Sequence, residues 1–177
     1  EHALELHPAG GLETKLIWAA ELLRIDLNAH RELFPVDPVE RNFTWALKTA
    51  GDLLELRETL NEKGLSCSDV ARIVENTEME PERWRDLASI ERHCVKATTE
   101  CGFADWQATR RHAAQNGKPP AGITRVVMAG VLDPSSLAIE ALETWSRHLP
   151  VEMLVYAPEA THRDCFDLWG RPRADAW

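Results

Sequence analysis

The sequence predicts a mixed α and α/β fold, in which a helical bundle subdomain is followed by a β–α–β unit of a parallel sheet. Apolar residues recur at helical spacing through most of the first 116 residues, and after residue 122 two β-branched runs flank one helix. The stretch Lys118-Pro-Pro-Ala-Gly122 separates the two patterns. We therefore expect a helical subdomain at 1–117, a linker at 118–122 and a β–α–β unit at 123–177.

The first part of the chain predicts four or five helices, starting with an apolar stripe along residues 12–30. Later helices begin where a capping residue or a proline precedes an apolar face, and they end where glycine allows a left-handed conformation. The later expected helices run from Asp37-Pro38 to Gly64, from Ser68 to about Asn76, from Glu80-Pro81 to Gly102, and from Asp105 to Asn116-Gly117.

The second part predicts two strands, 123–131 and 151–156, joined by a helix that Asp133-Pro134 opens and Pro150 follows. Two strands joined by a single crossover helix should be parallel. Parallel sheets normally have more than two strands and are covered on both faces. We therefore expect this unit to belong to a larger sheet and the sequence to be an internal piece of a longer protein.

Charge and composition exclude several classes of protein. The net charge is −9 and both parts of the chain are acidic, so no broad basic surface for nucleic acid is expected. No apolar run approaches the ~20 residues that span a bilayer, and no signal peptide is recognisable. The four cysteines match no zinc or redox spacing, which favours free thiols and a cytoplasmic location over a disulfide framework.

No motif predicts catalysis, a metal ion or a cofactor within this chain. The only Gly-Lys pair, Gly117-Lys118, is followed by two prolines, which cannot open a phosphate-binding helix. Glu13-Thr-Lys15 matches part of a PD-(D/E)xK nuclease site by letters, but it opens a helix and has no suitable acidic partner upstream. The dense group His162, Asp164, Cys165 and Asp167 resembles no metal-ligand template.

One small basic cluster and one arginine in the tail are the candidate DNA contacts. The cluster consists of Arg110, Arg111, His112 and Lys118, and a solvated helix end is the simpler interpretation of it. The residue in the tail is Arg171. In the tail, Phe166 and Trp169 would point the same way if they lay on one helical turn. Gly170 and Pro172 would end that turn, and Asp167 would pair with Arg171.

The last 55 residues resemble a segment of AddB-type helicase–nuclease subunits. The resemblance lies in the string Val151-Glu-Met-Leu-Val-Tyr-Ala-Pro-Glu159, the motif Phe166-Asp-Leu-Trp-Gly-Arg-Pro172 and a closing Trp177. The run Val126-Val-Met-Ala-Gly130 followed by Asp133-Pro134 is also similar to the family. The helical part is similar in arrangement to the helical insertion of superfamily-one helicases, with Trp84 to Leu87 and Gly102 to Asp105 as its weaker matches.

This resemblance implies a bacterial protein of DNA double-strand break repair, with an inactivated helicase-like core and a PD-(D/E)XK nuclease domain. The nuclease would use Mg²⁺, ATP would act in a partner subunit, and DNA and that helicase subunit, or further domains of the same chain, would be the partners. None of those active-site residues can be carried over to this sequence. The expected role is thus a non-catalytic scaffold that handles DNA; the alternative is a helical protein-interaction module without a nucleic-acid role, which the acidic charge favours.

Overall fold

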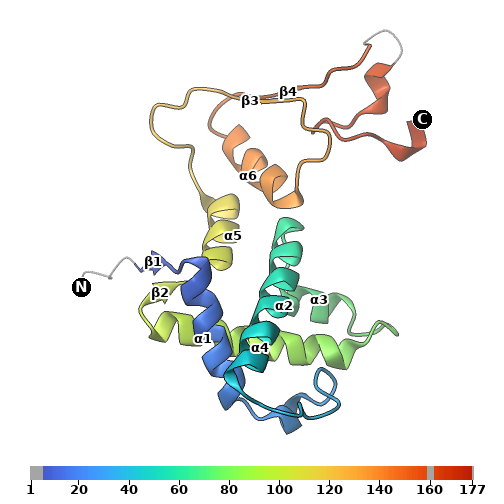
Figure 1. Cartoon of the computed structure of the whole chain (residues 1–177). Coiled ribbons are helices and arrows are strands. Elements are labelled where there is room, and N and C mark those ends of the chain that lie inside the picture. The colour runs from blue at the N-terminus through green and yellow to red at the C-terminus, as the bar shows by residue number, and fades with distance from the viewer. Residues whose placement is uncertain (1–5, 159–161, 177) are drawn as a thin grey trace. The chain divides into compact units, whose positions relative to one another are not determined.

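The computed structural model describes residues 6–158 and 162–176 of the chain. Within them, helices form most of the regular structure, and four short strands form two separate parallel pairs. This arrangement confirms the expected mixed α and α/β class (Figure 1). The elements are β1 (His7–Pro8), α1 (Gly11–Arg24), η1 (Leu27–His30), α2 (Phe43–Glu62), α3 (Cys67–Ile73), α4 (Pro81–Glu100), β2 (Phe103–Ala104), α5 (Trp106–Asn116), β3 (Val126–Ala129), α6 (Ser136–Ser146), β4 (Val151–Leu154), η2 (Arg163–Cys165) and η3 (Ala174–Ala176).

The contacts divide the chain into two compact units. Unit 1 comprises Glu1–Asn61 and Leu65–Thr109, and unit 2 comprises Glu62–Gly64 and Arg110–Trp177. Most of α5 therefore belongs to unit 2, as does the linker 118–122 that the sequence predicts. Contacts within unit 2 explain this, because the Thr144 hydroxyl donates to the carbonyl of Gln115 at 3.5 Å.

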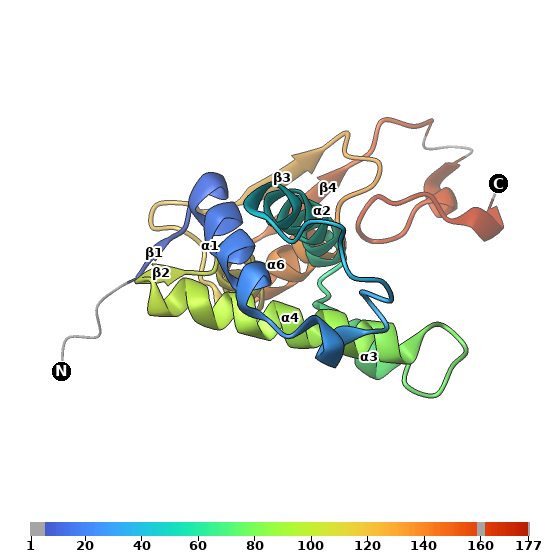
Figure 2. The same ribbon diagram turned by 60° about the horizontal axis from the view of Figure 1, so that its bottom comes forward.

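The core of unit 1 lies where α1, α2 and α4 meet. Small residues on α2 and α4 let the helices approach closely, while larger apolar side chains on α1 and α4 fill the remaining space. A second cluster lies between α3 and the first half of α4, which run side by side (Figure 2). The buried residues of the first cluster are Trp18, Ala19, Leu22, Ala46, Ala50, Ile90 and Cys94, and those of the second are Cys67, Leu87 and Ala88.

The expected start of the second helix at Asp37-Pro38 is wrong, because α2 begins at Phe43. The side chain of Asn42 caps it, accepting a hydrogen bond from the Trp45 amide at 3.0 Å. The preceding segment stays irregular because the Arg41 guanidinium bonds the carbonyls of Leu22 and Ile25 at the end of α1. Those carbonyls have no helical partner of their own, so the contact satisfies both elements.

Two other helix starts also differ from the sequence expectation, and both are set by a better serine cap. Ser66 rather than Ser68 caps α3, in a capping box with Asp69. Ser135 rather than Asp133 caps α6 and accepts a hydrogen bond from Ala138 at 3.3 Å. By contrast, Pro81 opens α4 as expected, and Gly64 and Gly102 follow α2 and α4 with positive φ angles.

Unit 2 contains the expected β–α–β arrangement. β3 and β4 pair in parallel, with Val126 opposite Val151 and Ala129 opposite Leu154. α6 lies along one face of this pair (Figure 1), and its buried apolar residues are Leu137, Ile139 and Leu142. Both strands are shorter than expected, because only residues 126–129 and 151–154 share the ladder.

The other parallel pair, β1 with β2, was not predicted from the sequence. It joins His7 to Phe103 and Pro8 to Ala104, and so ties the start of the described chain to the turn after α4. Two residues per strand are too few to show an alternating pattern.

None of the described helices combines the length and apolar content that crossing a bilayer requires. All four cysteines are free thiols.

Candidate functional site

The tail motif after β4 folds into a closed turn built around one carboxylate. Asp167 Oδ1 accepts hydrogen bonds from the backbone amides of Trp169 at 2.8 Å and Arg171 at 3.0 Å. Asp167 Oδ2 accepts from Arg171 Nε at 2.7 Å, which forms the ion pair expected from the sequence. The Asp167 amide in turn donates to the Arg171 carbonyl. One side chain thus holds both ends of the turn.

These bonds also set the charge state of Asp167. Partial burial by itself would raise the pKa of this carboxyl group, but the hydrogen bonds from Arg171 and Trp169 outweigh it and hold the pKa below its usual range. The carboxylate is therefore ionised at neutral pH and its acceptor positions are largely occupied. It is poorly suited to act as a general base or as a metal ligand.

The expected helical turn carrying Phe166 and Trp169 is wrong. Phe166 is extended and pairs with Pro172 in an antiparallel bridge, so the motif is a tight loop. Gly170 has a φ of 73°, and a Cβ there would lie 3.0 Å from Val155 Cγ2. Glycine is needed at this position both for its backbone conformation and for the close approach to the chain that follows β4.

Part of this turn lines a pocket of about 570 Å³ at the carboxyl end of β4. Ligands of α/β folds bind at the carboxyl ends of parallel strands, so its place is typical of a site. Most of the residues that line it have apolar side chains, and the carboxylate of Asp167 is already bonded within the turn. The lining residues are Met153, Leu154, Val155, Ala157, Pro158, His162, Phe166, Asp167, Leu168 and Gly170. Glu159 and Trp177, which also carry the resemblance, lie outside the described residues.

The candidate DNA contacts all lie in unit 2 but in different segments. Arg110 and Arg111 are on α5, Lys118 is exposed in the linker, and Arg171 is in the tail turn. Lys118 and Arg171 line separate pockets. Arg110 forms an ion pair with Glu62 at 2.9 Å, and hydrogen bonds from Arg110 and Ser135 lower the pKa of that glutamate. At least two of the four cations are thus held by acidic neighbours.

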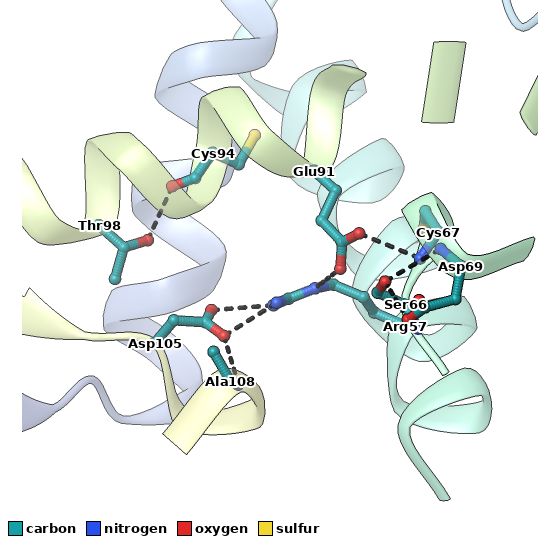
Figure 3. A network of polar contacts seen from close by, with 9 residues as sticks. All are labelled: Arg57, Ser66, Cys67, Asp69, Glu91, Cys94, Thr98, Asp105 and Ala108. Carbon is teal, nitrogen blue, oxygen red and sulfur yellow. Dashed lines mark hydrogen bonds and ion pairs between the residues drawn. The ribbon is translucent and has the colours of Figure 1, made fainter. Parts of the chain in front are cut away.

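An extensive polar cluster lies in unit 1, and it was not predicted from the sequence (Figure 3). Arg57 of α2 is only 4% exposed. Its Nε donates to Glu91 Oε1 of α4 at 2.5 Å, and its Nη1 and Nη2 donate to the two carboxylate oxygens of Asp105 at 2.9 and 2.8 Å. The guanidinium also lies over the Trp18 ring, with Cζ 5.1 Å from the ring centroid.

The two carboxylates of this cluster also hold backbone groups. Asp105 accepts a hydrogen bond from the Ala108 amide and caps α5, as its position in the sequence predicts. Glu91 Oε2 accepts from the Cys67 amide at the start of α3. Burial alone would lower the pKa of Arg57, but the hydrogen bonds and charges of Asp105 and Glu91 raise it above its usual value. The hydrogen bonds of the cluster join four helices, and its charged side chains are buried, which identifies it as structural.

A signal for this cluster is present in the sequence. Arg57 lies four residues after Leu53 and three before Leu60, so it sits within the apolar stripe of its helix. A charged residue at such a position must be paired or reach solvent. The partners could not be identified, because Glu91 and Asp105 are 34 and 48 residues away along the chain.

Two thiols of unit 1, those of Cys67 and Cys94, are buried. Burial, followed by the charge of nearby acidic residues, raises the pKa of the Cys67 and Cys94 thiols to about 12. Within residues 6–158 and 162–176, no group of three or more histidine, cysteine or acidic side chains is arranged to hold a metal ion.

The fold and these sites define a mixed α and α/β protein with a structural ion cluster in one unit and a locked turn beside a parallel strand pair in the other. A scan against models of protein families, a search of curated proteins and a search of solved structures each return no match. The resemblance to AddB-type subunits accordingly stays a prediction from sequence motifs.

Proposed function

We propose that this chain is a non-catalytic scaffold and DNA-handling part of a bacterial helicase–nuclease that acts in DNA double-strand break repair. The observation that carries the proposal is the turn of residues 166–172, which follows the second strand of a parallel β–α–β unit. It contains the motif on which the resemblance to AddB-type subunits rests, and its residues have evident architectural roles. Asp167 locks the turn, and Gly170 allows it to approach the strand.

The distribution of charge supports a scaffold over an enzyme. The clearest carboxylate cluster, Glu91 with Asp105, is neutralised in part by Arg57 and closed to solvent. In the protein we propose, Mg²⁺ would serve the nuclease domain and ATP a partner helicase subunit. The chain itself would contribute surfaces that position DNA and that partner.

A DNA titration tests the proposal. Fluorescently labelled single- and double-stranded oligonucleotides are titrated with the purified chain at several salt concentrations. We expect weak binding whose affinity falls as salt rises, because phosphate contacts release counterions. Replacing Arg110, Arg111 and Lys118 together by Ala should weaken binding and reduce the salt dependence, whereas Arg85→Ala, an exposed arginine of unit 1, should change neither.

An acidic protein-interaction module is the second candidate function. Two observations favour it: the net charge is −9, and Arg110 and Arg171 are paired with acidic side chains. Absence of salt-sensitive binding to either form of DNA, together with unchanged behaviour of the triple variant, would contradict the first proposal and support this one.

A further inference from the structure

Unit 1 contains a buried amide without a protein partner. Asn61, near the end of α2, is 2% exposed, and neither its Nδ2 nor its Oδ1 has a hydrogen-bond partner among the described residues. Burying an amide without hydrogen bonds is unfavourable, and most buried polar side chains of folded proteins have at least one partner. The unpaired amide of Asn61 is therefore unusual for a buried side chain.

The polar group one turn away does not supply the missing bonds. Arg57 lies four residues before Asn61 and so on the same face of α2. All three of its nitrogens already donate to Glu91 and Asp105. The two carboxylates thus hold the guanidinium, and it makes no hydrogen bond with the Asn61 amide.

Two other buried groups without a partner belong to segments that converge on the same arginine. The indole Nε1 of Trp18 is unpaired, and the Trp18 ring packs against the Arg57 guanidinium. The Oε1 of Gln107 is also unpaired, two residues after Asp105. Together these groups include donors at Trp18 and Asn61 and acceptors at Gln107 and Asn61.

We propose that Asn61 forms an internal hydration site beside the Arg57 cluster, in which ordered water bonds to the amide. Trp18 and Gln107 are the further groups that such water would satisfy. Water suits this site because it both donates and accepts, as the amide does. An anion would use only the Nδ2 donor, and a cation only the Oδ1 acceptor. Buried waters of this kind typically make about three hydrogen bonds to groups that are otherwise unpaired.

NMR of the wild-type chain tests the proposal directly. We expect dipolar cross-peaks between the Asn61 side-chain amide protons and a long-lived water in rotating-frame experiments, which distinguish them from proton exchange. The amide of Asn76, which is exposed in the same unit, should show only short-lived water. If Asn61 shows no long-lived water, the proposal is wrong.

A substitution provides an independent test. Leucine is similar in size to asparagine but cannot form hydrogen bonds with water. Asn61→Leu would therefore leave the other polar groups of the site unpaired. We expect the melting temperature of unit 1, followed by tryptophan fluorescence, to fall by about 2–4 °C. The same change at the exposed position, Asn76→Leu, should leave it nearly unchanged. A higher melting temperature for Asn61→Leu would indicate a dry, unpaired amide and would overturn the proposal. If this variant does not fold, the NMR measurement on the wild type decides.

Discussion

Arg57 is a charged residue that is buried among packed helices. Its guanidinium holds α4 through Glu91 and the cap of α5 through Asp105, inside a helical core. A buried ion pair of this kind contributes little when it is compared with an apolar replacement, but removing one partner leaves a buried charge without compensation. The cluster is therefore sensitive to single substitutions.

The first prediction concerns this residue. Arg57→Ala should lower the free energy of unfolding by about 3–5 kcal/mol, because Glu91 and Asp105 would remain buried and unpaired. Urea unfolding followed by tryptophan fluorescence measures the change. Arg85→Ala, which breaks an exposed pair with Glu82, should cost about 1 kcal/mol or less. Equal effects of the two substitutions would show that the buried cluster has no special role.

The second prediction concerns the thiols. Cys67 and Cys94 are buried and have pKa values raised to about 12, so little thiolate is present at pH 8. Cys101 is exposed and should react first with iodoacetamide. Mass spectrometry of the labelled peptides gives the order of reaction, and in urea all four cysteines should react at similar rates. Rapid labelling of Cys94 in the folded protein would contradict the arrangement described for α4.

At the scale of elements, local capping explains which segments are regular and which are loops. α3 and α6 each begin at a serine whose hydroxyl accepts an amide hydrogen bond. The tail turn uses the same chemistry, because Asp167 accepts hydrogen bonds from two backbone amides. Such a turn depends on the ionised carboxylate, which connects its stability to pH.

The third prediction follows from the sign of that dependence. The pKa of Asp167 is lower in the folded chain than its ordinary value, so the carboxylate stabilises the turn at neutral pH. That contribution is fully present above about pH 4, the ordinary pKa of aspartate, and is lost as the pH falls through the depressed value. The amide resonances of Trp169 and Arg171, followed by NMR, should shift together in this acidic range.

Asp167→Asn provides the control for this titration. The asparagine side chain keeps its shape but cannot ionise, so the same two amides should lose the acidic transition. A transition that persists unchanged in Asp167→Asn would show that another group controls the turn, and would remove the role assigned to this carboxylate.

At the scale of the whole molecule, the two units differ in how they are held together. Unit 1 is a helical assembly with two apolar clusters and a buried ion cluster. Unit 2 is built on a pair of four-residue parallel strands, one helix and a locked tail turn. Within the described part of the chain, neither unit contains three or more histidine, cysteine or acidic side chains arranged to hold a metal ion.

The fourth prediction is that the purified chain neither hydrolyses ATP nor cleaves DNA in the presence of Mg²⁺. Its sequence has no phosphate-binding loop and no carboxylate pair suited to a metal ion. Phosphate release and plasmid cleavage assays measure the two activities. Divalent-dependent cleavage that disappears on substituting a residue of this chain would prove the scaffold proposal wrong.

The amino-acid sequence by itself determined the features that depend on neighbouring residues. Helical periodicity, Pro81, the cap at Asp105 and the glycines after α2 and α4 identified most helices, and the β-branched runs identified the parallel strand pair. These signals suffice because caps, turns and amphipathic faces are formed within a few residues. Starts at Asp37 and Asp133 were misplaced because Asn42 and Ser135 provided the caps that the structure uses.

Only the tertiary structure decided the features that join distant segments. The partners of Arg57 lie 34 and 48 residues away, and the pairing of β1 with β2 joins residues almost a hundred positions apart. It also decided that the tail motif is a closed loop and not a helical turn, because Asp167 captures the amides of Trp169 and Arg171. A charged residue within an apolar stripe indicates that an oppositely charged partner is needed. Only the packing of the helices determines which residue is that partner.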